Sequence, residues 1–156
     1  MSDMLVKLYS LPEYNCIIKD QEKAGISIRR AIPPEKHVLS NWVRQNFSAP
    51  WASECEIAFS RQPVACFTAI FENKPVGFSC YDATCRGFLG PIGVHSEFRR
   101  KGIGKALLFA ALDAMWAVGY AYAIVGAAGP QEFFKKATNA ILIEGSSNSI
   151  YRTILR

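Results

Sequence analysis

The chain has little charge and few of the side chains that usually hold metal ions. Charged residues make up 20% of its 156 residues, and its only histidines are His37 and His95. Its five cysteines are odd in number, and no two have Cys-x-x-Cys spacing. This spacing predicts neither a zinc site nor a disulfide framework. We therefore expect no metal, and we expect reduced, mostly buried thiols.

Long hydrophobic runs are also missing. No apolar run approaches the roughly 20 residues that a membrane-spanning helix needs. The opening Met-Ser-Asp-Met lacks the basic start and apolar stretch of a secretory signal. We therefore expect no membrane partner and a cytoplasmic location. The 50% apolar content excludes a disordered chain, and the length predicts a single domain over residues 1–156.

Apolar spacing predicts a mixed α/β domain. The expected elements, in chain order, are a strand at 26–32, helices at 35–47 and 51–59, strands at 64–71, 76–83 and 87–94, a helix at 102–118, a strand at 121–128, a helix at 131–138, and a closing hairpin of 140–144 with 150–155. A right-handed crossover makes the strands on either side of helix 102–118 parallel. Residues 1–25 are expected to add a strand at 4–11 and a helix at 17–23.

One of these strands has an irregular centre. Pro91 stands inside strand 87–94, between Gly90 and Gly93. Proline has no N–H for a strand ladder, and glycines have no side chain to pack. The pattern predicts a bulge, or a place where a ligand meets the backbone.

Residues 99–105, Arg-Arg-Lys-Gly-Ile-Gly-Lys, place four cations and two glycines at the predicted start of helix 102–118. A helix N-terminus carries partial positive charge, so clustered cations are unfavourable there unless an anion lies between them. The free N–H groups of a first helical turn are natural phosphate ligands. The turn therefore predicts a site for a phosphorylated ligand.

The net charge of +5 does not require a nucleic-acid partner. The basic turn supplies four of the cations, and no basic stripe with interleaved aromatic residues is present elsewhere. Steering of a polyanionic small molecule explains the charge as well as DNA does. We expect no nucleic-acid partner.

Two common nucleotide motifs do not match the basic turn. A Walker A loop needs Ser or Thr after its Gly-Lys pair, but Ala106 follows Gly104-Lys105. A dinucleotide fingerprint needs a third glycine, and Leu107 stands in its place.

A third motif matches. Residues 94–108 resemble the acyl-CoA-binding signature of the GNAT N-acetyltransferase superfamily, whose core is Arg/Gln-x-x-Gly-x-Gly/Ala, here Arg99-x-x-Gly102-x-Gly104. The element order over 26–156 is similar to that family as well. The resemblance implies a mostly antiparallel sheet with a central parallel strand pair splayed around acyl-CoA, flanked by helices. It also implies that residues 1–25 are a family-variable N-terminal extension.

The function that the resemblance implies is acetyl transfer. The acetyl group moves from acetyl-CoA, the co-substrate, to a primary amine of a small molecule or peptide. The amine attacks the thioester directly, within a ternary complex. Homodimers are common in the family and are one expectation here. The alternative is a non-catalytic acyl-CoA-binding sensor or regulatory protein.

The resemblance also implies site residues. The turn amides wrap the CoA diphosphate, and the strand ending at Val94 lies beside the pantetheine arm. The N–H of Val94, or of a neighbour, binds the thioester carbonyl as a catalytic group. The expected cofactor-binding residues are Ile92, Gly93, Val94, Arg99, Arg100, Lys101, Gly102, Ile103, Gly104, Lys105 and Phe134.

The chain departs from the family where an acid and a base are expected. Phe134 stands where many members have the tyrosine that protonates the leaving thiolate, and a phenyl ring donates no proton. Water, Tyr122 or Tyr151 are the open substitutes. No motif identifies a base, and Glu132 and Asp82 are the catalytic candidates, with surface roles as the alternative.

The acceptor side of the site is expected on the two early helices. They carry Trp42, Phe47 and Trp51, and also Glu54 and Glu56. Together these side chains can form an aromatic and acidic pocket for a cationic amine. Core packing and solvation explain them equally well, so both interpretations stay open.

Overall fold

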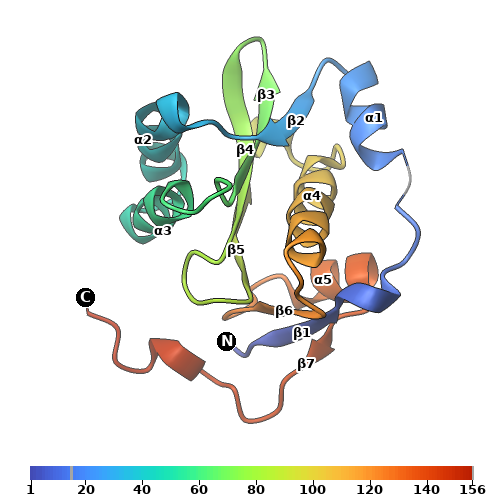
Figure 1. The fold of residues 1–156 in the computed structure, drawn as a ribbon, viewed down its shortest axis with the longest axis vertical. Helices are drawn as coiled ribbons and strands as arrows, with labels where there is room; N and C mark the ends of the chain where they lie inside the picture. The colour runs from blue at the N-terminus through green and yellow to red at the C-terminus, as the bar shows by residue number, and fades with distance from the viewer. Residues whose placement is uncertain (15, 156) are drawn as a thin grey trace.

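The structure is a computed structural model that describes residues 1–14 and 16–155. Its strands form one seven-stranded sheet in the order β2-β3-β4-β5-β6-β1-β7 (Figure 1). The strands are β1 (Met4–Lys7), β2 (Ser27–Arg30), β3 (Cys66–Phe71), β4 (Lys74–Tyr81), β5 (Phe88–Val94), β6 (Tyr122–Val125) and β7 (Ile141–Leu142). All neighbours pair antiparallel except β5 and β6, which are parallel.

Helices cover both faces of this sheet. They are α1 (Ile17–Lys23), α2 (Lys36–Asn46), α3 (Ala49–Phe59), α4 (Ile103–Ala117) and α5 (Gln131–Thr138). Figure 1 shows α2 and α3 on one side of the central strands, with α1 and α4 on the other. None of the helices in the described residues has the length and apolar character to cross a membrane.

Helix α4 supplies much of the core. Ten of its residues are buried, and it packs against β3, β4 and β5. It lies so close to the sheet that a Cβ on Gly77 would come within 2.8 Å of Leu107. Ser79 of β4 donates a 2.9 Å hydrogen bond to the carbonyl oxygen of Leu107. The sheet therefore fixes the position of α4, and with it the turn that precedes the helix.

The predicted fold class is confirmed, with helices at 17–23 and 131–138 and a parallel strand pair around α4. The closing hairpin is wrong. Strand β7 covers only two residues and pairs with β1, and residues 149–151 form a 3-10 turn. Asn148 and Ser149 both have positive φ, which bends the chain out of the extended conformation that a strand needs.

The N-terminal segment takes part in the sheet. Strand β1 lies between β6 and β7, and it ends at Lys7, earlier than expected, because residues 8–10 form a 3-10 turn. That residues 1–25 vary among relatives stays a prediction.

Strands β5 and β6 separate soon after they pair. Their paired residues are Phe88 with Ile124 and Leu89 with Val125. Beyond Leu89, β5 continues to Val94 with β4 as its partner. Between the pairs Ser79–Ile92 and Tyr81–Leu89, β5 has one residue more than β4, so the predicted bulge at Gly90–Pro91 is confirmed. The divergence exposes one edge of β5.

Candidate active site

A groove of about 980 Å³ opens where β5 and β6 diverge. Strand β5 forms one wall, and the segment that follows β6 and the start of α5 form another. Helix α3 and the C-terminal tail contribute the remaining lining residues. The lining is mostly apolar, with Glu54 and Arg99 as its charged side chains.

The exposed edge of β5 presents backbone donors to this groove. The N–H of His95 donates a 2.8 Å hydrogen bond to Val76 at the β4 edge. Successive N–H groups of a strand point to opposite edges, so those of Val94 and Ile92 face away from β4. In the described chain no strand pairs with that edge beyond Leu89. Two amides therefore remain available along the groove.

The basic turn offers further donors. Among the described residues, the amides of residues 100–105 donate to no backbone oxygen, and no side chain accepts from them. Gly102 has φ of +82° at the helix N-cap, and Arg100 has φ of +61°. These amides lie at the N-terminus of the 15-residue helix α4, where the helix dipole adds partial positive charge. Free amides at the N-terminus of a helix have the chemistry to bind an anion.

Two side chains hold the turn in place. Gln21 of α1 donates from Nε2 to the carbonyl oxygen of Lys101 at 2.8 Å. Arg99 donates from Nε to the carbonyl oxygen of Val94 at 3.1 Å, which joins the turn to the end of β5. Gln21 was not predicted from the sequence. A glutamine in a short helix, 80 residues before its partner, carries no local signal.

Six of the expected cofactor-binding residues line the groove: Ile92, Gly93, Val94, Arg99, Gly104 and Phe134. The other five do not: Arg100, Lys101, Gly102, Ile103 and Lys105. The side chain of Ile103 is 1% exposed and belongs to the core, so only its amide can face a ligand. Phe134 is 2% exposed and belongs to the groove lining.

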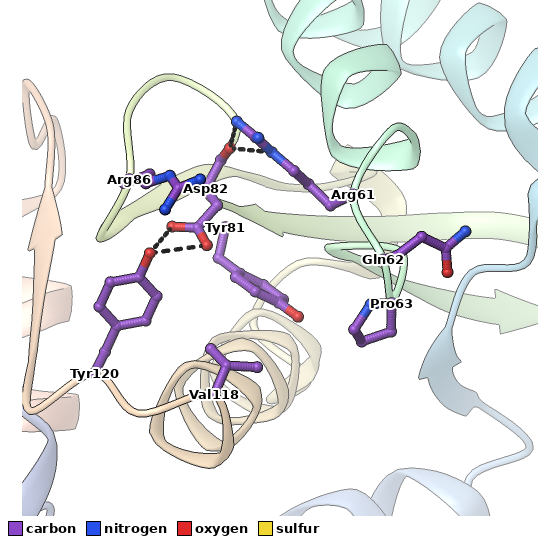
Figure 2. Close-up of a pocket in the computed structure, with 8 residues that line it drawn as sticks. All are labelled: Arg61, Gln62, Pro63, Tyr81, Asp82, Arg86, Val118 and Tyr120. Atoms are coloured by element: carbon purple, nitrogen blue, oxygen red, sulfur yellow. Dashed lines mark hydrogen bonds between the residues drawn. The ribbon is translucent and has the colours of Figure 1, made fainter.

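Asp82 lies in a different, smaller cavity of about 250 Å³ (Figure 2). Its carboxylate accepts hydrogen bonds from the Tyr120 hydroxyl at 2.9 and 3.0 Å, and from the N–H of Gly87 at 2.7 Å. Its carbonyl oxygen accepts from Arg61 at 3.1 and 2.9 Å. These contacts hold the loop before β5, and they do not bring Asp82 to the groove.

Glu132 also lies away from the groove lining. It is in the first turn of α5, its side chain is 74% exposed, and it pairs with Lys135 at 3.3 Å. The structure therefore brings neither expected base to the β5 edge. The catalytic roles of Asp82 and Glu132 stay predictions.

Glu54 is the carboxylate that lines the groove. Helix α3 positions it, because Ser48 caps the first turn through the N–H of Trp51 at 3.3 Å and Pro50 suits a first-turn position. Burial raises the pKa of the Glu54 carboxyl, and a hydrogen bond from the Thr84 hydroxyl opposes that rise. A half-buried carboxylate with a raised pKa can accept a proton at neutral pH.

Tyr151 supplies a hydroxyl in the same groove. Burial raises its pKa, and a hydrogen bond with Thr84 opposes that rise. A Cβ on Gly126 would lie 2.8 Å from the Tyr151 Oη, so the absence of a side chain there leaves room for the hydroxyl. Tyr122, the other open substitute for the acid, is 47% exposed and its hydroxyl lies 3.4 Å from that of Tyr9.

The expected acceptor pocket is only partly assembled. Trp51 and Glu54 line the groove. Trp42 and Phe47 instead pack with Trp51 and Phe78, and Phe47 covers Gly93 so closely that a Cβ there would meet it at 2.6 Å. Glu56 accepts from Ser40 at 2.6 Å and lies 3.7 Å from Arg44.

Comparison with solved structures supports the fold. The GCN5-related glucosamine N-acetyltransferase region of a fungal multi-domain GH3 beta-N-acetylglucosaminidase matches with a TM-score of 0.73 and 15% identity, over 91% of this chain and 19% of that chain. A GCN5-related N-acetyltransferase from Sphaerobacter thermophilus matches with a TM-score of 0.64 and 18% identity, over 91% and 48%. This chain therefore spans about a fifth and about half of those two proteins.

A third structure is close to this chain in length. The ribosomal-protein-alanine N-acetyltransferase from Brucella melitensis biovar Abortus 2308 matches with a TM-score of 0.58 and 17% identity, over 84% of this chain and 98% of that chain. At these identities the likeness shows the fold alone. No curated protein sequence matches the chain.

The family model described as the acetyltransferase (GNAT) family matches residues 36–136, well over half of the chain. The match includes α2 to α4, most of α5, the divergent strands and the basic turn. With a seven-stranded sheet and parallel pair of the expected kind, this chain belongs to the GNAT acetyltransferase family.

Proposed function

We propose that the protein is an N-acetyltransferase that moves an acetyl group from acetyl-CoA to a primary amine of a small molecule or peptide. The observation that carries the proposal is the row of amides at 100–105 that have no partner among the described residues, next to a groove with an open strand edge. The amine attacks the thioester directly, with both substrates bound. Membership of the family supports the acetyl transfer, and the role proposed for each residue rests on the geometry of this chain.

The diphosphate fits the basic turn. Six consecutive amides lack protein acceptors in the described chain, and Arg99, Arg100, Lys101 and Lys105 add positive charge around them. A Cβ on Gly104 would have only Val94 and Phe133 nearby, at 3.6 and 4.0 Å, so Gly104 leaves the approach to the backbone open. The chemistry and the space both suit a doubly phosphorylated group.

The pantetheine arm and the acetyl group fit the β5 edge. The amides of Ile92 and Val94 face that edge and can pair with the arm as a further strand does. The Val94 N–H lies near the end of the edge, and it is our candidate donor to the thioester oxygen. A fixed backbone donor stabilises the negative charge that develops on that oxygen without reorganisation.

Glu54 is suited to receive the proton of the amine. A primary amine is mostly protonated at neutral pH, so a proton must leave the nitrogen before it attacks. The Glu54 carboxylate lines the groove on α3, next to Trp51, and both side chains favour a cationic acceptor. Glu54 thus attracts the ammonium group and then takes its proton.

Tyr151 is suited to protonate the leaving sulfur. As the nitrogen–carbon bond forms and the carbon–sulfur bond breaks, the thiolate needs one proton to become the free thiol. Tyr151 carries a hydroxyl in the groove, whereas the Phe134 ring has none. The ammonium group loses its first proton to Glu54 before the attack. The nitrogen loses a second proton as the amide forms, and that proton replaces the one that Tyr151 gives to the sulfur. The products are the amide, the free thiol and a protonated Glu54, which releases its proton to water.

Two measurements test this function. Calorimetry with CoA tests the binding site, and complete absence of heat at millimolar CoA would contradict the proposal. A panel of amines with acetyl-CoA, read out as free thiol, tests the transfer. Release that depends on the amine supports the enzyme. Tight CoA binding with no release from any amine supports the non-catalytic sensor, which the phenyl ring of Phe134 favours.

A further inference from the structure

Three cysteines meet inside the core, away from the groove. Cys55 comes from α3, Cys66 from β3 and Cys80 from β4. Their sulfur atoms all lie within 4.8 Å of one another, and each residue is 0% exposed. Cys66 and Cys80 are direct cross-strand partners, and α3 places Cys55 over that pair. The chain folds three thiols from distant positions into one cluster.

Within residues 1–14 and 16–155 the cluster offers three donors and no fourth. Among the described residues, no other histidine, cysteine or carboxylate joins the group. The surroundings are the main apolar core, which includes Val43 and Phe78. Structural zinc in proteins almost always takes four ligands, so three thiols in a dry core are a poor zinc site. Sulfur donors favour soft ions, and the number of donors favours an ion that binds in three-coordinate geometry.

The charge of the complex also limits which ions three buried thiolates can bind. Three thiolates around a monovalent or divalent ion leave a net negative charge, which is costly in an apolar interior. The charged groups that act on the trio, Glu35 and Glu56, are themselves negative and add to that cost. A trivalent ion gives a neutral product with three thiolates.

We propose that Cys55, Cys66 and Cys80 form a binding site for a soft trivalent ion, with arsenic(III) as the representative of the class. Neutral arsenous acid carries three hydroxyl groups. Three sulfur–arsenic bonds form as three arsenic–oxygen bonds break, and each thiol proton leaves with one hydroxyl as water. No oxidation occurs and no charge accumulates in the core.

Binding at this site joins helix α3 to strands β3 and β4 through bonds to one atom. The bound protein is therefore more stable than the free one, because the fold already holds the three sulfurs within 4.8 Å whereas an unfolded chain has to bring them together. This site is separate from the groove and does not depend on the proposed acetyl transfer.

The test uses the reduced full-length chain with arsenite and native mass spectrometry. Cys16 is exposed and Cys85 half-buried, so the double variant Cys16→Ser/Cys85→Ser is a matched control that keeps the trio. We expect both proteins to gain one arsenic and lose three hydrogens. We also expect the melting temperature to rise by about 5 °C. Cys66→Ala should retain a hydroxyl on arsenic, or bind none.

The mass alone distinguishes the outcomes. An adduct of three sulfurs is lighter by one water than an adduct of two sulfurs and a hydroxyl. No arsenic on the folded wild type, or loss of the adduct in the Cys16→Ser/Cys85→Ser variant, overturns the proposal. These two results do not require that any core variant folds. Zinc(II) and copper(I) added alone should bind more weakly than arsenite, and tighter zinc binding would contradict the charge argument.

Discussion

The side-chain amide of Gln21 donates a 2.8 Å hydrogen bond to the carbonyl oxygen of Lys101, 80 positions later in the chain. Gln21 is buried near the end of α1, and its main-chain carbonyl oxygen accepts a 2.9 Å hydrogen bond from the N–H of Ile26. The N-terminal helix thus supports the loop whose amides are proposed to hold the CoA diphosphate. This contact gives the first prediction.

Gln21→Ala should weaken CoA binding without unfolding the protein. It removes one hydrogen bond to the turn, which is worth about 1 kcal/mol, or about a fivefold rise in the CoA dissociation constant. Calorimetry measures the change. Gln45→Ala, at an exposed position on α2, is the control and should bind CoA as the wild type does. Equal affinities for the two variants would show that Gln21 does not support the site.

Gly102→Ala and Gly119→Ala form a matched pair. Both glycines have positive φ, +82° and +103°, so each alanine should cost about 1 kcal/mol of folding free energy. A Cβ at Gly119 meets nothing within 4 Å, whereas one at Gly102 would come within 2.9 Å of Gln21 Nε2. Urea unfolding should show both losses, the larger at Gly102. Only Gly102→Ala should weaken CoA binding, and an equal effect from Gly119→Ala would contradict this.

Glu54→Gln should lower acetyl transfer about 100-fold with CoA affinity unchanged, because it removes the proposed base. Burial raises the pKa of Glu54, so the rate in the wild type should rise with pH through a range above that of an ordinary carboxyl group. The variant should lose this rise. Glu56→Gln, two positions later on α3 and hydrogen-bonded to Ser40, is the control and should keep it.

The same pKa shift makes a prediction about stability. The folded protein binds the Glu54 proton more tightly than the unfolded chain does. The protonated carboxyl therefore contributes to the free energy of unfolding at low pH. This contribution is lost as the pH rises through the raised pKa. Glu54→Gln should therefore be at least as stable as the wild type at pH 7 in urea unfolding. A clear loss of stability would mean that the charged carboxylate is stabilised in a way that this account lacks.

Tyr151→Phe should reduce turnover while the KM for acetyl-CoA changes little, since only the proton donor is removed. Tyr9→Phe, at an exposed position, is the control. Adding Phe134→Tyr to the Tyr151→Phe variant should restore part of the rate, because it puts a hydroxyl back into the same groove. If the Tyr151→Phe enzyme were as fast as the wild type, water rather than Tyr151 would protonate the leaving thiolate.

The sequence was sufficient for the features that depend on local chemistry. The bounds of α1 and α5, the bulge at Gly90–Pro91 and the place of the basic turn at the start of α4 all follow from residues close together in the chain. The family followed from one motif in the right order of elements. Local patterns carry this information because helix periodicity, proline and glycine act within a few residues.

Features that depend on distant partners were not predictable in the same way. Glu54 and Tyr151 share the groove only because α3 and the C-terminal tail meet there. Gln21 reaches the turn from α1, and the cysteine trio combines three elements. The expected hairpin failed for the same reason. Strand β7 pairs with β1, at the other end of the chain, and not with the residues that follow it.

The most direct test of the proposed diphosphate site is an amide NMR titration of the 15N-labelled protein with CoA and, separately, with pantetheine, which lacks the diphosphate. We predict that CoA shifts the amide signals of residues 100–105 and those of Ile92 and Val94. Pantetheine should shift only the two strand amides. Unchanged signals for residues 100–105 at saturating CoA would contradict the account.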